Sequence, residues 1–300
     1  MWGFPSQHVA IGDVELVVVG IAQDGGVPQA GCECERCVVA MKDESKRLHP
    51  VSCIIRGSDG SIHLIEATRA IASQLGIAAI SLEVGTSVTP DSVCLTHAHL
   101  GHIDGLGQFG KEAMGLDDVT LFASNSVIRV LNDRGLSKPF RANEVVAGVA
   151  FAPSAECGFE FKFVRVPHRD EDSDTHAIII IGPQYSLLFL PDHDDWDETL
   201  KMVGHEGIRE WLMALDIDYA LVDGTFWNAN ELGGRDMSQV PHPTISDSLN
   251  RLGDRDKGDP NISFIHLNHT NPALDPESEQ SEQLASTGWS VAEQGSIIAL

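Results

Sequence analysis

The sequence predicts an α/β protein built as one large domain over residues 1–300. Short apolar or alternating runs, which are typical of β-strands, recur along the whole chain and are interspersed with longer segments of helical periodicity. With 300 residues, of which 42% are apolar, the chain can bury a large core, which suits one two-layer domain or two modest ones. We favour one domain, because neither an internal repeat nor an interdomain linker is visible.

Each element is predicted from its pattern of apolar residues. Strands are expected at residues 14–19, 52–56, 63–65, 93–95, 119–122, 159–166, 177–181, 187–190, 219–222, 262–265 and 297–300. Helices are expected at residues 68–75, 103–114, 124–134, 196–215, 245–252 and 277–286. The stretch 253–260 is rich in Asp and Gly, so we expect a surface loop there.

The composition argues against two classes of partner. A formal net charge of -24 would repel nucleic-acid phosphates, and no local basic groove is visible, so we expect no nucleic-acid substrate. The chain has no apolar run of about 18 residues, and its first residues lack the basic flank and apolar stretch of a secretory signal. We therefore expect a cytoplasmic protein that has no membrane partner and takes a small-molecule substrate.

Three histidines lie close together, directly after the apolar run 93–95: His97, His99 and His102. In extended backbone, side chains two residues apart point the same way, so His97 and His99 can hold one ion. His102, past a turn, then faces the opening that they leave. Surface histidines also cluster by chance, but imidazole is the commonest metal ligand, so this spacing predicts a metal site.

Other polar residues follow apolar strands in the same manner: His168, Asp192, Asp223 and His266. Side chains at the ends of strands are held more rigidly by the sheet than side chains in loops, which suits a site assembled from several strands. Each of these residues alone is also consistent with an ordinary turn or cap. Together with the three histidines, they predict a single site on one rim of the sheet.

Three cysteines share a short glycine-flanked loop, residues 31–37: Cys32, Cys34 and Cys37. Structural zinc takes four ligands, often three cysteines and one histidine, so the spacing predicts a structural zinc with a fourth ligand from elsewhere. A disulfide or ordinary buried thiols are the alternatives, but cytosolic chains rarely keep disulfides. The other cysteines are single residues in apolar contexts and are expected in the core: Cys53, Cys94 and Cys157.

The order of the candidate ligands along the chain resembles that of the metallo-β-lactamase superfamily. This resemblance implies an αββα sandwich, with two mixed sheets flanked by helices and a one- or two-metal centre at the sheet edge. Within the superfamily, the chain resembles the pyrroloquinoline quinone biosynthesis protein B (PqqB) group in its motifs at residues 20–29, 223–227 and 266–272. It also resembles the phosphodiesterase (PhnP) of carbon–phosphorus lyase pathways, which carries an early cysteine cluster and a late paired-histidine segment.

The resemblance implies a role for each candidate ligand. His97, His99 and His168 would hold a first metal ion. Asp192 would bridge to a second ion, which His102 and His266 would hold. The likeness to PhnP points to His269 as the fourth ligand of the structural zinc.

One position departs from the superfamily pattern, because Gly101 stands where an Asp is usual. The remaining second-site set of His102, Asp192 and His266 has the composition of the facial triad of non-haem iron oxygenases. The alternative is a weak second site and a mononuclear enzyme. We expect Gly101→Asp to raise the occupancy of the second site without unfolding the protein. Asp24 can also approach the site, although Asp-Gly is an ordinary turn pair.

Three functions follow from this reading. The first is a metal-dependent hydrolase, in which metal-bound water attacks an ester, amide or phosphodiester of a small molecule. Asp223 and His242 are then candidates for orienting water or protonating the leaving group, although His242, between two prolines, also suits a plain turn. The second, which the PqqB resemblance favours, is a non-haem iron oxygenase in cofactor or small-molecule biosynthesis. The third is a non-catalytic carrier or accessory protein.

The predicted sites and the family resemblance also indicate which cofactors and which assembly to expect. One structural zinc is expected, together with one or two active-site ions of Zn, Mn or Fe. Superfamily members often dimerise, so the resemblance also suggests a homodimer.

Overall fold

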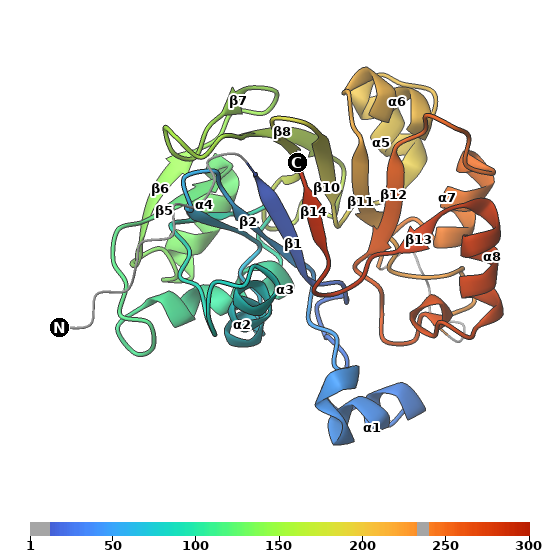
Figure 1. Cartoon of the computed structure of the whole chain (residues 1–300), viewed down its shortest axis with the longest axis horizontal. Helices are drawn as coiled ribbons and strands as arrows, with labels where there is room; N and C mark the ends of the chain where they lie inside the picture. Colours follow the sequence, from blue (N-terminus) through green and yellow to red (C-terminus); the bar gives the residue numbers. More distant parts are fainter. Residues whose placement is uncertain (1–12, 233–239) are drawn as a thin grey trace.

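The computed structural model describes residues 13–232 and 240–300, and it shows two β-sheets packed face to face between outer layers of helices (Figure 1). Each sheet has seven strands among the described residues, and each mixes parallel with antiparallel neighbours. This αββα arrangement confirms the predicted fold class.

The first sheet is built from the N-terminal half of the chain and its last strand. Its order is β14 (Ile297–Ala299), β1 (Glu15–Gly20), β2 (Ser52–Arg56), β3 (Ile62–Ile65), β4 (Ser92–Cys94), β5 (Val119–Ala123) and β6 (Phe140–Glu144). Strands β14 to β3 pair antiparallel, whereas β3 to β6 pair parallel.

The second sheet follows the same plan. Its order is β13 (Ser290–Val291), β12 (Asn261–Ile265), β11 (Tyr219–Asp223), β10 (Ser186–Leu190), β9 (Thr175–Ile181), β8 (Glu160–Val166) and β7 (Ala150–Phe151). Strands β10 to β13 pair parallel, and β7 to β10 pair antiparallel.

The helices are short, and most of them cover the outer faces of the sheets. They are α1 (Glu35–Lys42), α2 (Ile71–Ser81), α3 (Leu100–Ile103), α4 (Asn125–Asp133), α5 (Trp196–Val203), α6 (Ile208–Ala214), α7 (Ile245–Leu252) and α8 (Glu279–Thr287). In Figure 1, α1 stands apart below the sandwich, in blue. Within the described part of the chain, no helix is long and apolar enough to cross a bilayer.

Successive residues of the central strands serve two different cores, because side chains alternate across a sheet. In β1, Leu16 packs between the two sheets and Val17 packs toward the helices outside the first sheet. In β10, Phe189 packs between the sheets and Leu188 packs toward the helices outside the second. Strands buried on both faces are nearly continuous apolar runs, which is why the sequence predicts them well.

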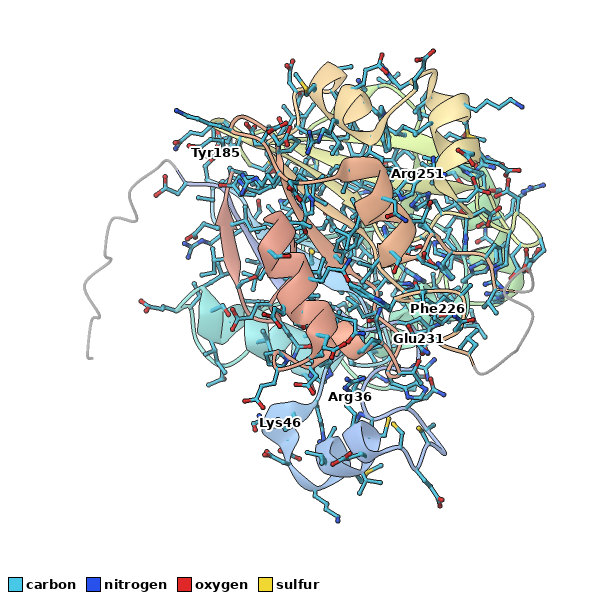
Figure 2. All side chains as sticks on the ribbon, turned by 90° about the vertical axis from the view of Figure 1, so that its right-hand side faces the viewer. Arg36, Lys46, Tyr185, Phe226, Glu231 and Arg251 are labelled. Atoms are coloured by element: carbon cyan, nitrogen blue, oxygen red, sulfur yellow. The ribbon has the colours of Figure 1, made fainter. Side chains whose placement is uncertain are left out.

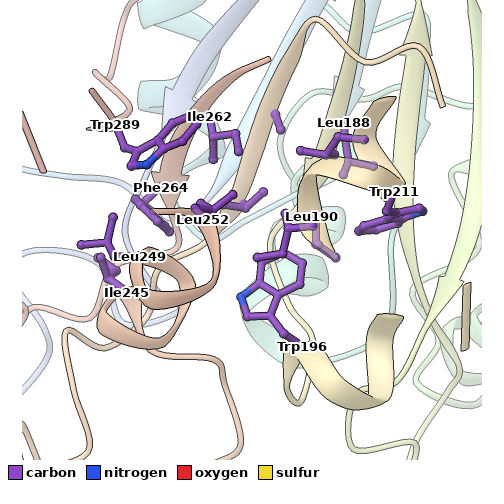
Figure 3. Close-up of a cluster of buried hydrophobic side chains, with 14 of the residues drawn as sticks. Leu188, Leu190, Trp196, Trp211, Ile245, Leu249, Leu252, Ile262, Phe264 and Trp289 are labelled. Carbon is purple, nitrogen blue, oxygen red and sulfur yellow. The ribbon is translucent and has the colours of Figure 1, made fainter. Parts of the chain in front are cut away.

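The core outside the second sheet is rich in aromatic residues (Figure 3). Trp196 of α5 and Trp211 of α6 pack with Leu188 and Leu190 of β10, and both indoles are 1% exposed. The indole nitrogen of Trp196 donates a hydrogen bond to Ser248 Oγ of α7 at 2.7 Å. This packing fixes α5 and α7 over the strands β10 and β11, whose ends carry candidate site residues.

Three predicted helices are wrong in extent. Residues 196–215 form two helices, because Gly204 adopts a left-handed conformation (φ 79°) and ends α5. Residues 103–114 form a 3₁₀ helix, Asp104–Phe109, followed by turns, since several glycines weaken a regular α-helix there. The helix expected at 68–75 begins at Ile71 and runs to Ser81.

Among the described α-helices and β-strands, five were not predicted from the sequence: α1, α3, β6, β7 and β13. Strand β6 has the sequence Phe-Arg-Ala-Asn-Glu and none of its residues is buried, so it has no apolar pattern to detect. Strands β7 and β13 have two residues each, and α1 buries only Cys37 and Ala40.

Candidate metal centre

The predicted ligands converge on one edge of the sandwich. His97 and His99 follow β4, His168 follows β8, Asp192 follows β10, and His266 follows β12. The structure brings their ligand atoms into overlapping groups in which all atoms lie within 4.8 Å of one another: His97, His99 and His168; His97, His102 and Asp192; and Asp192, Asp223, His242 and His266. The predicted side chains therefore lie together, as expected for one shared site. The role of each side chain as a metal ligand stays a prediction.

The first group consists of His97, His99 and His168. Nε2 of His97 lies 2.9 Å from Nδ1 of His99. Nδ1 of His97 lies 2.9 Å from Thr96 Oγ1, which leaves Nε2 facing the group. Nε2 of His168 is buried and has no hydrogen-bond partner among the described residues. A cation held by these nitrogens would satisfy that atom, so the donor set fits a divalent metal.

The second group adjoins the first through Asp192. One carboxylate oxygen of Asp192 lies 3.1 Å from Nε2 of His102, and the other lies 3.6 Å from Nε2 of His266. That second oxygen is also 3.6 Å from Nε2 of His168, which belongs to the first group. Asp192 therefore lies between the two groups, as the expected bridging role requires.

A further set of side chains orients the imidazoles from behind. Glu66 is fully buried and its Oε2 lies 3.6 Å from Nδ1 of His102. Thr225 Oγ1 lies 2.8 Å from Nδ1 of His266 and donates a hydrogen bond to Asp223 at 2.7 Å. Asp194 lies 3.3 Å from Nδ1 of His168. Such contacts fix ring orientation and tautomer, which tunes a metal ligand.

Glu66 was missed by the sequence reading, although the signal that found the other residues applies to it. It directly follows β3, as His266 follows β12. Both residues have positive φ angles, 65° for Glu66 and 61° for His266. Positive φ is costly for residues other than glycine and is concentrated at functional sites, where the surrounding structure enforces it.

Burial and neighbouring charges shift the pKa values of the candidate histidine ligands in different directions. Burial lowers the pKa of His97 well below 6.5, and neighbouring histidines lower it further. Burial also lowers the pKa of His99 to about 4. For His102, burial acts to lower the pKa, but the carboxylates of Asp192 and Glu66 raise it well above 6.5. Metal binding requires neutral imidazole, and the lowered pKa values of His97 and His99 favour that form.

His242 and Asp223 stand beside these groups. Nδ1 of His242 lies 2.7 Å from Oδ2 of Asp223 and 3.9 Å from Oδ1 of Asp192. Both side chains are buried, and Asp223 also accepts hydrogen bonds from the backbone and hydroxyl of Thr225. The structure thus brings both predicted catalytic candidates to the candidate metal centre.

The space beside Gly101 is occupied by Asp24. A Cβ atom at position 101 would lie 2.1 Å from Cγ of Asp24, so any side chain there would displace Asp24. The expectation that Gly101→Asp simply adds a ligand is therefore corrected.

The cysteine loop forms a separate candidate site. Cys32, Cys34, Cys37 and His269 offer ligand atoms that all lie within 4.8 Å of one another. Nδ1 of His269 lies 3.5 Å from the sulfur of Cys32 and 3.6 Å from that of Cys34. Three thiols and an imidazole match the donor set of a closed structural zinc site.

The cysteine site joins α1 to the body of the protein. Figure 2 shows Arg36 of α1 and Lys46, four residues beyond that helix, below Phe226 and Glu231. Arg36 donates a hydrogen bond of 2.6 Å to the carbonyl oxygen of His269. Because His269 lies three residues beyond His266, an ion held here would also restrain the loop that carries a candidate ligand of the main centre.

An αββα sandwich with histidines and an aspartate gathered at its sheet edge defines a class of metal-binding proteins. A family model described as a beta-lactamase superfamily domain matches residues 64–258, and the chain belongs to that superfamily.

Curated relatives extend the similarity over nearly the whole chain. Coenzyme PQQ synthesis protein B of Ruegeria pomeroyi is 26% identical, covering 96% of this chain and 100% of the relative. The protein of the same name from Rhodopseudomonas palustris is 24% identical over the same shares.

Solved structures show the same fold. The Zn²⁺-bound PqqB of Methylobacterium extorquens superimposes with a TM-score of 0.75 at 22% identity, covering 95% of this chain and 100% of that one. A diphosphatase of the PhnP family gives a TM-score of 0.66 at 20% identity, covering 96% and 98%. The resemblances to the superfamily, to PqqB and to PhnP are thereby confirmed.

Proposed function

We propose that this chain is a metal-dependent hydrolase that cleaves an ester, amide or phosphodiester bond of a small molecule. The observation that supports it most is the pair of His242 and Asp223 beside the candidate ligand Asp192. A hydrolase needs a group that protonates the leaving group, and an imidazole held by a buried carboxylate is suited to that task.

In this proposal the metal ions activate water, and His242 and Asp223 handle the proton. When bound, the metal ions would lower the pKa of water to about 7 and stabilise the negative charge that develops on the attacked group. Asp223 accepts a hydrogen bond from Nδ1 of His242, which leaves Nε2 as the atom that exchanges a proton with substrate. Asp223 itself is held by two hydrogen bonds from Thr225, so the imidazole has a fixed partner.

Arg169 supports an anionic substrate such as a phosphodiester. Its Nη2 lies 3.5 Å from Nδ1 of His99, and its side chain is 31% exposed at the edge of the centre. A guanidinium binds phosphoryl oxygens through paired hydrogen bonds. In a chain of net charge -24, a cation at this position favours anions over neutral esters, in competition with the carboxylate of Glu171 at 3.9 Å. The PhnP-family diphosphatase, a neighbour in fold, is consistent with this class.

A second candidate function is oxidative. The full-length similarity to coenzyme PQQ synthesis protein B favours it, as does the corner of His102, Asp192 and His266, which has the two imidazoles and one carboxylate of non-haem iron oxygenases. A carrier or accessory role is the third.

Anaerobic turnover separates these functions. The protein is loaded with zinc or manganese under nitrogen and given a chromogenic phosphodiester and a neutral ester. His97→Ala is the inactive comparison, and His205→Ala, at a partly buried histidine outside the ligand groups, is the matched control. We expect hydrolysis by the wild type and by His205→Ala only. Oxygen uptake with iron and no anaerobic hydrolysis would favour the oxygenase, and neither activity would favour the carrier.

A further inference from the structure

Asp24 lies where a carboxylate at position 101 would lie. A Cβ atom added to Gly101 would be 2.1 Å from both Cγ and Oδ1 of Asp24, and 2.6 Å from its Cβ. These distances are far inside van der Waals contact, so position 101 accepts no side chain while Asp24 is in place. Gly101 lies in helix α3 and has no positive φ, so the lack of space, not the backbone conformation, requires glycine here.

Asp24 also faces the second group of candidate ligands. Its Oδ1 lies 3.4 Å from Nε2 of His102 and 3.4 Å from Nε2 of His266. The three side chains form a set whose ligand atoms all lie within 4.8 Å of one another. The same two Nε2 atoms face Asp192. Each imidazole therefore has two carboxylates within reach, one from Asp24 and one from Asp192.

Backbone pairing holds Asp24 in this position. Just before it, the amide of Gln23 donates a hydrogen bond of 2.9 Å to the carbonyl oxygen of Leu267, and the amide of Leu267 donates one of 2.9 Å to Ile21. The turn then closes with a 2.7 Å bond from the amide of Gly26 to Gln23. Because Leu267 directly follows His266, one stretch of paired backbone sets the position of both Asp24 and the imidazole.

We propose that Asp24 is a ligand of the second metal ion and replaces, from the turn after β1, the carboxylate that Gly101 cannot supply. The second site then holds two imidazoles and two carboxylates: His102, His266, Asp24 and Asp192. The added negative charge favours a firmly held divalent ion and a two-metal centre over the facial-triad composition. The proposal rests on the metal centre and not on the hydrolytic reaction, so it stands or fails independently of the proposed function.

The decisive variant is Asp24→Asn, which keeps the size of the side chain and removes its charge. Protein that retains its structural zinc is titrated with Mn²⁺, and free Mn²⁺ is counted by electron paramagnetic resonance. Since loss of even an indirect partner of a metal ligand weakens affinity by about tenfold or more, we expect at least that increase in the dissociation constant of the second ion. The matched control is Asp104→Asn, a nearby carboxylate that pairs with Arg69 and lies outside the ligand groups.

A relocation of the carboxylate provides a gain-of-function test. Gly101→Asp alone should weaken the second site or destabilise the fold, because the new side chain collides with Asp24. Asp24→Gly combined with Gly101→Asp removes all three colliding atoms and returns a carboxylate from α3. We expect this pair to bind the second ion more tightly than Asp24→Gly alone does.

The Asp24→Asn titration decides the proposal if the paired variant does not fold. Unchanged stoichiometry and affinity for Mn²⁺ in Asp24→Asn would overturn it, whatever the activity of the protein. A second ion that is lost in Asp24→Asn and kept in Asp104→Asn would support it.

Discussion

Nδ1 of His242 lies 2.7 Å from Oδ2 of Asp223, and both side chains are buried next to the candidate bridging residue Asp192. Four side chains that can bind a cation or a proton thus lie together at one corner of the candidate centre, the His242 corner: Asp192, Asp223, His242 and His266. The corner can serve either as part of the metal site or as the acid of a hydrolase, and metal content distinguishes the two.

The first prediction concerns the acid. His242→Gln should lower kcat by about 10²–10⁴-fold, the range that general acid catalysis typically contributes, while leaving metal content unchanged. Asp223→Asn should give a similar loss, because the imidazole loses the acceptor that fixes its tautomer. Steady-state kinetics and elemental analysis of the same preparations provide the check. Loss of one metal ion from His242→Gln would identify His242 as a ligand instead.

The second prediction concerns the charge of the substrate. Arg169→Met should raise KM for an anionic phosphodiester by about tenfold, equal to about 1.4 kcal/mol, and leave KM for a neutral ester unchanged. The matched control is Arg141→Met, since Arg141 is exposed and pairs with Asp118 on the surface. Equal effects on both substrates would show that Arg169 supports the fold of the centre and does not bind substrate charge.

The third prediction concerns the cysteine site. Cys32→Ser should remove one zinc ion per chain and lower Tm by at least about 5 °C, because structural zinc contributes folding free energy. The matched control is Cys157→Ser, a buried cysteine outside the cluster, which should keep its zinc. Elemental analysis and thermal unfolding measure both effects. Full zinc content in Cys32→Ser would contradict a closed four-ligand site.

The fourth prediction concerns a histidine remote from both sites. His63 is 1% exposed, with Nδ1 2.8 Å from Ser92 Oγ and Nε2 2.8 Å from Ser61 Oγ. Burial lowers the pKa of His63 to about 4, although Asp91 and Asp59 act to raise it. Unfolding therefore takes up a proton between pH 6.5 and about 4, and the free energy of unfolding falls as the pH is lowered through that window.

Replacing His63 tests this linkage. His63→Asn removes a pH-dependent contribution of about 3 kcal/mol across the window, so its free energy of unfolding should depend less steeply on pH than that of the wild type. Urea denaturation at several pH values measures both slopes, and contributions from metal ligands common to both proteins cancel in the comparison. Parallel curves would mean that His63 is protonated in the folded protein as readily as in the unfolded chain.

The candidate ligands could be predicted from the sequence because the patterns that indicate them involve only neighbouring residues. The spacing of His97, His99 and His102 is visible in one segment. His168, Asp192 and His266 each lie within two residues of the end of an apolar strand. The ends of neighbouring parallel strands meet at one edge, so a residue's place at a strand end also indicates its place in the fold. Glu66 carried the same signal, and its role behind His102 was within reach of the same reasoning.

The sequence by itself therefore determined the fold class, the strands buried on both faces and most of the predicted donors. Only the tertiary structure decided that Asp24 fills the space beside Gly101, that His242 bonds to Asp223, and that the helix at 196–215 breaks at Gly204. The physical reason is that periodicity and strand ends are properties of neighbouring residues. Asp24 and Gly101 are 77 positions apart, and only the folded chain places Asp24 where a Cβ at position 101 would come within 2.1 Å of it.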